Sequence, residues 1–381
     1  MLYYRSFTTP AAMFRRIAPN LLYEYFSSRK ALDGFNWNSL QRTPGQMMDE
    51  LVAEYQKIPP KKRDEIEEEL RDVCNLSNLQ AQETLQSVCK QFGLIWDDEM
   101  MPEDRAIRVL MENKDAFQTA CNWANLESYE SFTDYFGAKP KDANDWSDIK
   151  ANFTEAWKLL LQNQSKGYGR VYIEHYQSDD RQAYLVYYEA PKKFVTRFDD
   201  RTDKPAEKAE KPVLESLMIY YPKLGKLKVK SRYEDIAEQA RDSYSRLALG
   251  DEDFLKSPDK TRLYDLNQFK KKLGPSDFPT DPKDGIVSVK AVSLKFRPDA
   301  LTKDTIEVNS VKDLKARLKT LKLDLGDAVI KRARLQVKFD GTGAGSLRSF
   351  NLSMPNKNTL GDSLKDRLLG KYLVKWGVAN R

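Results

Sequence analysis

The hydrophobic period of the chain changes near Gly167, and that change limits the fold to two dissimilar parts. Before it, apolar residues recur every three or four positions, and segments open on helix-start signals such as Thr43-Pro44-Gly45-Gln46. After it, apolar and polar residues alternate, as in 171–176, which is typical of strands. We therefore expect an α+β fold: an all-helical N-terminal domain (1–165) followed by a mixed α+β C-terminal domain (166–381) with mainly antiparallel strands.

Local signals refine both parts. Helices are expected over 102–118, 126–136 and 146–164 in the first part. In the second part, the capping box Ser231-Arg232-Tyr233-Glu234 predicts the start of another helix. The segment 199–213 has almost no large apolar residue and is predicted to be a flexible loop.

Two further features belong to the C-terminal part. The prolines at 275, 279 and 282 mark a long connection, which leaves a subdivision of the domain near 275–285 open. The strand expected over 287–297 shifts its alternation by one residue between Ala291 and Val292, which predicts a β-bulge.

Charge is divided unequally along the chain. Residues 1–165 carry 19 Lys or Arg against 26 Asp or Glu, a net charge of −7, whereas residues 166–381 carry a net charge of +13. Most of this excess lies in 286–381, with 20 basic and 9 acidic residues. Such an asymmetry indicates a polyanionic partner for the basic part.

The basic residues near the end of the chain fall into two stripes. Lysines recur every three or four positions beside the apolar stripe of a helix expected over 311–325, and basic residues alternate with apolar ones in a strand expected over 329–339. We expect helix and strand to form one continuous cationic surface that contacts phosphate; the alternative is that the helix lysines are simply its solvated side. The predicted nucleic-acid-binding residues are Lys312, Lys315, Lys319, Lys322, Arg332, Arg334, Lys338 and Arg348.

Few residues suit catalysis or metal binding. His175 is the only histidine of the chain, so no two-histidine metal site forms within it. Cys74, Cys89 and Cys121 form no C-x-x-C pair, which argues against a zinc site and fits a reducing cytosol. The glycine-rich segment 340–346 lacks the Lys-Ser/Thr of a P-loop and is predicted to be a hairpin tip. We expect no metal and no cofactor.

One constellation is similar to a metal-dependent nuclease site. Asp179, Asp180 and Glu189 supply carboxylates for Mg²⁺, with Lys192 beside the attacked phosphate. The spacing Glu-x-x-Lys, with Pro191 between, would place the last two on opposite faces of a continuing strand. Surface acids in a turn are therefore the favoured interpretation.

The chain shows no membrane signal. Its apolar runs fall short of the about 18 residues that cross a bilayer. The first 23 residues contain Arg5, Arg15 and Arg16 but no acid, which suits either a mitochondrial transit peptide or a first helix capped by Thr9. We favour the helix, and we expect no membrane partner and a cytoplasmic location.

The C-terminal segment carries a resemblance. It runs Met354-Pro355-Asn356 and closes on Trp376-Gly377, so that a strand ending in Pro-Asn is followed by a helix that ends at a Trp-Gly pair. This pattern resembles the ends of uncharacterised bacterial proteins linked to anti-phage defence operons. The resemblance covers under a tenth of the chain and carries no catalytic residue. It implies a component of a multi-protein antiviral system in which another subunit does the chemistry.

These observations favour a non-enzymatic binding subunit over an enzyme. We expect its basic C-terminal surface to engage a polyanion, with nucleic acid (DNA or RNA) as the first candidate, and we expect a further protein subunit as a partner. The first alternative is an assembly subunit whose basic surface meets an acidic protein. The second alternative is the metal-dependent nuclease at Asp179 and Glu189.

Overall fold

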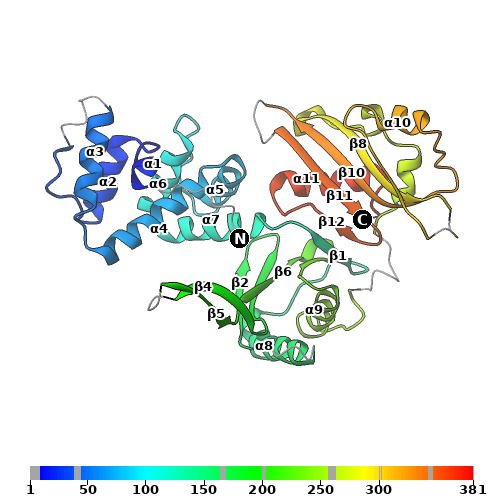
Figure 1. Cartoon of the computed structure of the whole chain (residues 1–381), viewed down its shortest axis with the longest axis horizontal. Coiled ribbons are helices and arrows are strands. Elements are labelled where there is room, and N and C mark those ends of the chain that lie inside the picture. The colour runs from blue at the N-terminus through cyan, green and yellow to red at the C-terminus, as the bar shows by residue number, and fades with distance from the viewer. Residues whose placement is uncertain are drawn as a thin grey trace. The chain divides into compact units, whose positions relative to one another are not determined.

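The structure, a computed structural model, describes residues 9–37, 44–163, 169–199, 203–255, 263–299, 301, 303–341 and 346–380. The chain divides into two compact units (Figure 1). Unit 1 comprises Met1–Tyr129 with Gly361–Arg367, and unit 2 comprises Glu130–Leu360 with Leu368–Arg381. The helices are mainly N-terminal and the strands mainly C-terminal, which confirms the α+β fold. The boundary lies after Tyr129 and not near residue 165.

Unit 1 is built from helices around one apolar core. Proline occupies the first turn of several of these helices, where its missing N–H needs no partner. Asn78 and Asn113 cap two others by accepting a backbone N–H with the side-chain oxygen. In the described part of unit 1 the N-terminal helices are α1 (Pro10–Phe14), α2 (Pro19–Ser28), α3 (Pro44–Tyr55), α4 (Pro60–Leu76), α5 (Leu79–Gln91), α6 (Pro102–Glu112) and α7 (Lys114–Glu127).

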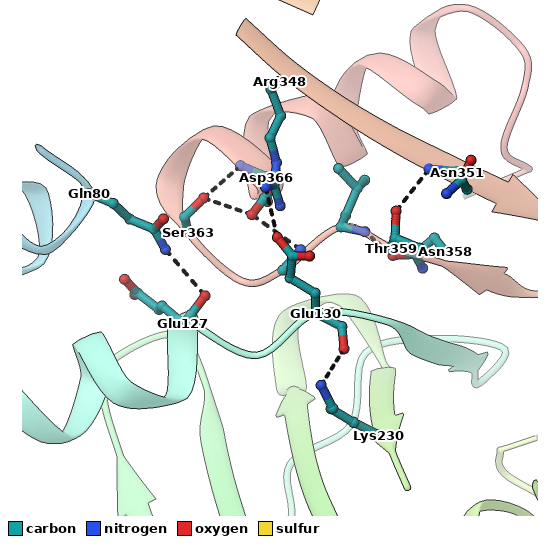
Figure 2. Close-up of polar contacts among 12 residues, drawn as sticks. Gln80, Glu127, Glu130, Lys230, Arg348, Asn351, Asn358, Thr359, Ser363 and Asp366 are labelled. Atoms are coloured by element: carbon teal, nitrogen blue, oxygen red, sulfur yellow. Dashed lines mark hydrogen bonds and ion pairs between the residues drawn. The ribbon is translucent and has the colours of Figure 1, made fainter. Parts of the chain in front are cut away.

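The start of the chain and the end of unit 1 agree with the capping rules. Thr9 accepts the N–H of Ala12 and Pro10 begins α1, as the sequence predicts. The predicted Thr43 cap lies outside the described residues. Ser363 caps the C-terminal helix α11 (Leu364–Lys375) by accepting the N–H of Asp366 at 3.1 Å, and the hydroxyl donates to the Asp366 carboxylate at 2.9 Å (Figure 2).

Unit 2 consists mainly of one antiparallel sheet. The strands of this sheet are β1 (Phe132–Phe136), β2 (Val171–Gln177), β3 (Gln182–Glu189), β6 (Val213–Tyr221), β7 (Lys226–Lys230), β8 (Ile286–Arg297), β9 (Ile306–Asn309), β10 (Val329–Phe339), β11 (Leu347–Ser353) and β12 (Lys357–Asn358). Their order is β2-β3-β6-β7-β1-β12-β11-β10-β8-β9. A separate ribbon pairs β4 (Lys193–Asp199) with β5 (Lys204–Glu210). The longer helices are α8 (Trp146–Asn163), α9 (Glu234–Leu247) and α10 (Leu314–Thr320), and the 3₁₀ turns are η2 (Pro222–Leu224), η3 (Leu266–Lys270), η4 (Pro275–Asp277) and η5 (Pro282–Asp284).

The two halves of this sheet bury opposite faces. In the half β2-β3-β6-β7-β1, α8 and α9 pack on the face that carries Tyr135 and Val229. In the half β12-β11-β10-β8-β9, α10 and α11 pack on the face that carries Leu335 and Leu352. Paired residues of neighbouring strands point to the same side of a sheet. The pairs that cross from one half to the other join Val229 to Thr133, Lys357, Ser353 and Arg332 in turn. The side covered by α8 and α9 in the first half is therefore the side that α10 and α11 leave open in the second half.

Three sequence predictions are wrong in this unit. Residues 132–136 form the strand β1 where a helix was expected, because the aromatic, alternating Phe-Thr-Asp-Tyr-Phe fits a pleated surface. The helix α8 packs on the sheet of unit 2 and not in the helical domain. Lys204–Glu210, expected to lie in a flexible loop, pairs with β4, since ladder hydrogen bonds require no apolar side chains; residues 200–202 lie outside the described set.

The predicted β-bulge is confirmed. The register between β10 and β8 shifts at Val292, where the bulge was expected. The connection near 275–285 contains η4 and η5, and Phe278 packs into the same core as the sheet half beside it. No helix within the described ranges has the length and apolar character needed to span a membrane.

Candidate nucleic-acid interface

The central strand of the candidate interface is β10. Along it, Ala333, Leu335 and Val337 are buried against the helices, while Arg332, Arg334 and Lys338 are exposed. Strict alternation along the strand therefore sends the three cations to the opposite face, as the sequence predicts. We call this side of β8–β12 the open face.

Neighbouring strands add further cations to the open face. Lys290 and Lys295 on β8 lie opposite Gln336 and Arg332, and Lys357 on β12 lies opposite Ser353. On the described strands of this half, the carboxylate on the open face is that of Glu307, which lies on the edge strand β9 opposite Lys295. The face is therefore strongly cationic, and polar residues of β11 occupy the positions between the cations.

Several of these cations have no partner in the part of the chain that the structure describes. No side-chain hydrogen bond or ion pair is made there by Arg334, Lys338 or Lys295. Lys290 donates to the carbonyl oxygen of Val311 at 2.5 Å. The charges of the first three side chains are thus available to a ligand.

Two other cations of the open face are partly engaged. Arg332 donates from Nε to the Ser353 hydroxyl at 3.2 Å, a neutral acceptor that leaves its charge uncompensated. Lys357 forms an ion pair with Glu234 at 2.8 Å, with both side chains exposed enough for solvent to weaken the pair. Neither contact removes the cationic character of the face.

The predicted helix lysines lie on the other side of the sheet. Leu314 and Leu318 of α10 pack into the core beneath Leu335, so the helix belongs to the layer that covers the buried face. Lys315 and its neighbours point away from that core and are exposed. The continuous cationic surface expected from helix and strand is therefore not formed, because the connection from β9 takes α10 to the opposite side.

The lysine helix is also shorter than predicted. It spans Leu314–Thr320 and ends before Lys322, whose φ of 53° lies in the left-handed region. Lys312 precedes the helix, which is capped by Asp313. Lys312 and Lys322 are exposed in the segments that flank α10 and do not extend a helical stripe.

Arg348 does not belong to the open face. It lies opposite Val337, and its side chain is on the side of Phe350 and Leu352, so the expectation that it joins the strand cations is wrong. Figure 2 shows its guanidinium directed toward Glu130, with 2.7 Å between Nη1 and Oε1. The signal was present in the sequence, since Arg348, Phe350 and Leu352 alternate.

A groove of about 800 Å³ opens where the open face meets α9. Its floor is formed by Arg332, Asn351, Ser353 and Lys357, and one wall is the first turn of α9. Thr133 and other residues of β1 and β7 close the end nearest the covered half. The groove arises because the helix layer of the first half stops at β1, where the open face begins.

The first turn of α9 adds two carboxylates to the groove, shortly after the exposed Arg232. Glu234 and Asp235 occupy the first turn, and both are exposed. The predicted capping box is wrong: Tyr233 is the N-cap residue and supplies no side-chain cap, while the Ser231 hydroxyl bonds to that of Ser216 at 3.2 Å. Ser231 directly follows β7, which explains why it faces a neighbouring strand.

The nuclease constellation is not assembled. Glu189 is held by Arg170, with 2.6 Å between Nη2 and Oε1, and these hydrogen bonds keep the pKa of the Glu189 carboxyl below its usual range. Ser178 donates to Asp180 at 2.9 Å in the turn between β2 and β3. Across the described ranges, no three Asp, Glu, His or Cys side chains are placed to hold a metal ion.

His175 has a packing role. Its ring stacks on Trp146 at 5.3 Å and lies 4.8 Å from the ring of Tyr184. Burial lowers the pKa of His175. Of the glycine-rich segment, 342–345 lie outside the described residues, and the flanking strands β10 and β11 are antiparallel neighbours, as a hairpin requires.

The Pro-Asn and Trp-Gly residues of the C-terminal segment have structural roles. Asn356 is buried; its amide donates to the carbonyl of Asp134 at 3.1 Å and its oxygen accepts the N–H of Leu263 at 2.8 Å. Trp376 donates to the carbonyl of Pro279 at 2.9 Å and packs on Phe278. The pattern therefore serves to join strands and turns within unit 2.

Sequence reasoning missed Lys290 and Lys295 as members of the face, together with the groove. The alternation of Lys290 with apolar neighbours was a usable signal for β8. The groove had no such signal, because Lys357 reaches it through pairing with Thr133, far away in the sequence. No protein-family model matches the chain, and no curated protein matches it in sequence.

Proposed function

We propose that the chain is a non-enzymatic binding subunit whose open face binds a polyanion, namely nucleic acid. The observation that carries the proposal is that Arg334, Lys338 and Lys295 share one face of the adjoining strands β8 and β10 and have no side-chain partner among the described residues. A cation without a carboxylate partner keeps its full attraction for phosphate, and each phosphate contact releases condensed counterions.

The dimensions of the face support several phosphate contacts at once. Along β10, alternate side chains stand about 6.7 Å apart, and neighbouring strands are about 4.8 Å apart. Arg332, Arg334 and Lys338 therefore span about 20 Å of strand. A surface of this extent matches a stretch of backbone phosphates better than it matches a single small anion.

Paired charge reversals on the two sides of the sheet test the proposal. The variant R334E/K338E alters the open face, and the matched control K315E/K319E makes the same change of charge on α10, in the opposite layer. Binding of labelled single- and double-stranded oligonucleotides is measured by fluorescence anisotropy at several salt concentrations. We expect R334E/K338E to weaken binding about 100-fold or more and to reduce the salt slope by about two, while the control changes affinity only severalfold.

The comparison of these variants has clear adverse outcomes. Salt-independent binding, or no binding by the native chain, contradicts the proposal. Equal losses in both variants would show that the whole basic end attracts nucleic acid without a defined face. A loss confined to the α10 variant would return the site to the helix lysines.

The assembly alternative is favoured by a different observation. On the β4-β5 ribbon, Phe194 and Phe198 lie on the same side and are 72% and 67% exposed. Exposed aromatic side chains are enriched at protein interfaces. Under this alternative, a protein partner remains bound at 1 M salt and is released by F194S/F198S, whereas R334E/K338E has no effect.

The cellular setting is part of the proposal. The C-terminal resemblance supports a role as one component of a prokaryotic defence system, in which another chain does the chemistry. Burial raises the pKa of the Cys74 and Cys89 thiols to about 11, so both stay protonated, and no disulfide forms among the three cysteines. Free thiols support a cytoplasmic location. Expression of the chain alone and with its genomic neighbours during phage infection tests this setting.

A further inference from the structure

The groove beside α9 is continuous with the open face. Arg332, Ser353 and Lys357 belong to both, because they stand on the strands of the face and also form the floor of the groove. A strand of nucleic acid on the open face would therefore pass the mouth of the groove. The volume of about 800 Å³ is sufficient for one nucleotide with its ordered water.

The two sides of the groove have different chemistry. Arg332 of β10 lies on one side and donates to the neutral hydroxyl of Ser353, so its positive charge attracts a phosphate there. On the opposite side, Asp235 has an exposed carboxylate that makes no hydrogen bond or ion pair with the described residues. A carboxylate repels phosphate but accepts hydrogen bonds from amino groups. The groove thus suits a ligand that is anionic at one end and carries amino hydrogens at the other.

Asn351 adds a second recognition group. It lies on β11 between the two sides, and its backbone N–H donates to the Thr359 hydroxyl at 2.8 Å. Its side-chain amide makes no hydrogen bond within the described ranges. An Asn amide presents a donor and an acceptor together, which matches the edge of adenine, while Asp and Glu accept from the amino group of cytosine.

On the basis of the proposed function, we infer that the groove binds one unpaired nucleotide of the nucleic-acid strand held on the open face. Its phosphate lies at Arg332, and the amino group of its base lies at Asp235 and Asn351. The partner is therefore single-stranded where it crosses the groove, since the groove holds one nucleotide and a paired base would bring its complement with it. Adenine and cytosine are preferred over thymine and uracil, which have no exocyclic amino group.

Alanine substitutions inside and outside the groove test this inference. D235A and N351A remove the two base contacts. The matched controls are E307A and N309A, which remove a carboxylate and an amide from β9, on the same open face but outside the groove. Affinities for the 12-mers dA12, dC12 and dT12 are measured by anisotropy at one fixed salt concentration.

The expected pattern separates base recognition from general electrostatics. The native chain binds dA12 or dC12 about tenfold more tightly than dT12. Removing the Glu307 carboxylate in E307A strengthens binding of every oligonucleotide because it reduces repulsion, whereas D235A strengthens binding of dT12 but not of dA12 or dC12, which lose a hydrogen bond. Only D235A and N351A also abolish the preference for amino-bearing bases; E307A and N309A keep it.

The outcomes distinguish this inference from the function on which it rests. Salt-dependent binding that R334E/K338E weakens, but that shows no base preference, overturns the groove and leaves the open face in place. A preference that survives in both D235A and N351A overturns it as well. If the native chain binds no oligonucleotide, the proposed function fails and the inference fails with it.

Discussion

The two halves of the sheet in unit 2 differ in which face they bury, and this difference creates the candidate site. On one and the same side, the first half is covered by α8 and α9, whereas the second half is open. The residue types on that side differ between the halves: apolar Tyr135 and Val229 are buried beneath α9, whereas the open face carries the charged Lys357 and Arg334. A sheet that was covered on the same side throughout would have neither the open face nor the groove.

The comparison also shows how charge is distributed by packing. Helices remove water from the positions that they cover, and a cation left there unpaired would be costly. Where the helix layer ends at β1, the same pleat position meets water again and accepts a cation without penalty. The change from Thr133 to Lys357 across one strand pair marks this limit.

The largest change in stability is expected from two variants that each place one lysine on β10, on opposite sides of the sheet. Leu335→Lys puts an ammonium into the core beneath α11, whereas Gln336→Lys puts it on the open face one residue later. We expect L335K to destabilise the fold by about 3–5 kcal/mol and Q336K by less than about 0.5 kcal/mol. Urea denaturation followed by circular dichroism measures both.

The second variant of this pair also tests the function. Q336K adds a cation between Arg334 and Lys338 and should tighten binding of oligonucleotides severalfold, with a steeper salt slope. If Q336K destabilised the chain as much as L335K does, the assignment of the two faces of β10 would be wrong.

Much of the open face could be predicted from sequence, because it depends on local alternation. Arg332, Arg334 and Lys338 share a face with no reference to the rest of the fold. The position of the helix lysines could not be predicted. Their spacing in the sequence shows that they share one side of a helix, but the connections before and after α10 decide on which side of the sheet that helix packs. For Arg348 the phase of β11 was available and was overlooked.

The groove depends on contacts between distant parts of the sequence. Its floor exists because β12 pairs with β1, which brings Lys357 beside Thr133, and because β7 delivers α9 to the same place. Neither pairing has a signature in a single sequence, since each strand is short and β12 is separated from β1 by more than half the chain. Register between distant strands is set by the whole fold.

A smaller change in stability is expected from substitution of two buried tryptophans, one in the core of each half of the sheet. Trp376 of the second half donates to the carbonyl of Pro279, whereas the indole N–H of Trp157 in the first half has no partner in the described part of the chain. Trp376→Phe therefore leaves a void and an unpaired carbonyl, but Trp157→Phe leaves a void and removes an unpaired donor. We expect losses of about 2–3 and about 1 kcal/mol, respectively.

Urea denaturation of the two variants, compared at equal m-values, measures this difference. Because both substitutions replace tryptophan by phenylalanine, the side-chain volume that is lost is the same in the two halves. Equal losses would show that the hydrogen bond to Pro279 contributes nothing measurable, and a larger loss for W157F would reverse the comparison.

The smallest effect concerns acid, to which the two halves should respond differently. An ordinary histidine titrates between pH 5 and 7, and His175, the only histidine of the chain, lies in the first half. Burial lowers the pKa of His175 below its unfolded value, so the unfolded chain takes up the proton first. The stability that neutral His175 contributes is fully present above about pH 6.5 and is lost as the pH falls toward 5. Since the ring is only partly buried, we expect this loss to be less than about 1 kcal/mol.

His175→Phe keeps the stacking on Trp146 and removes the proton site, so the variant should lose less stability than the native chain between pH 7 and pH 5. The difference between the two chains at the two pH values isolates His175 from other groups. Among these other groups is Asp72 in unit 1, whose pKa is raised to about 6 by burial. Its protonation stabilises the folded state as the pH falls, which is opposite to the effect of His175. Denaturation of both chains at both pH values gives the result, and a variant as acid-sensitive as the native chain would place the titrating group outside the first half of the sheet.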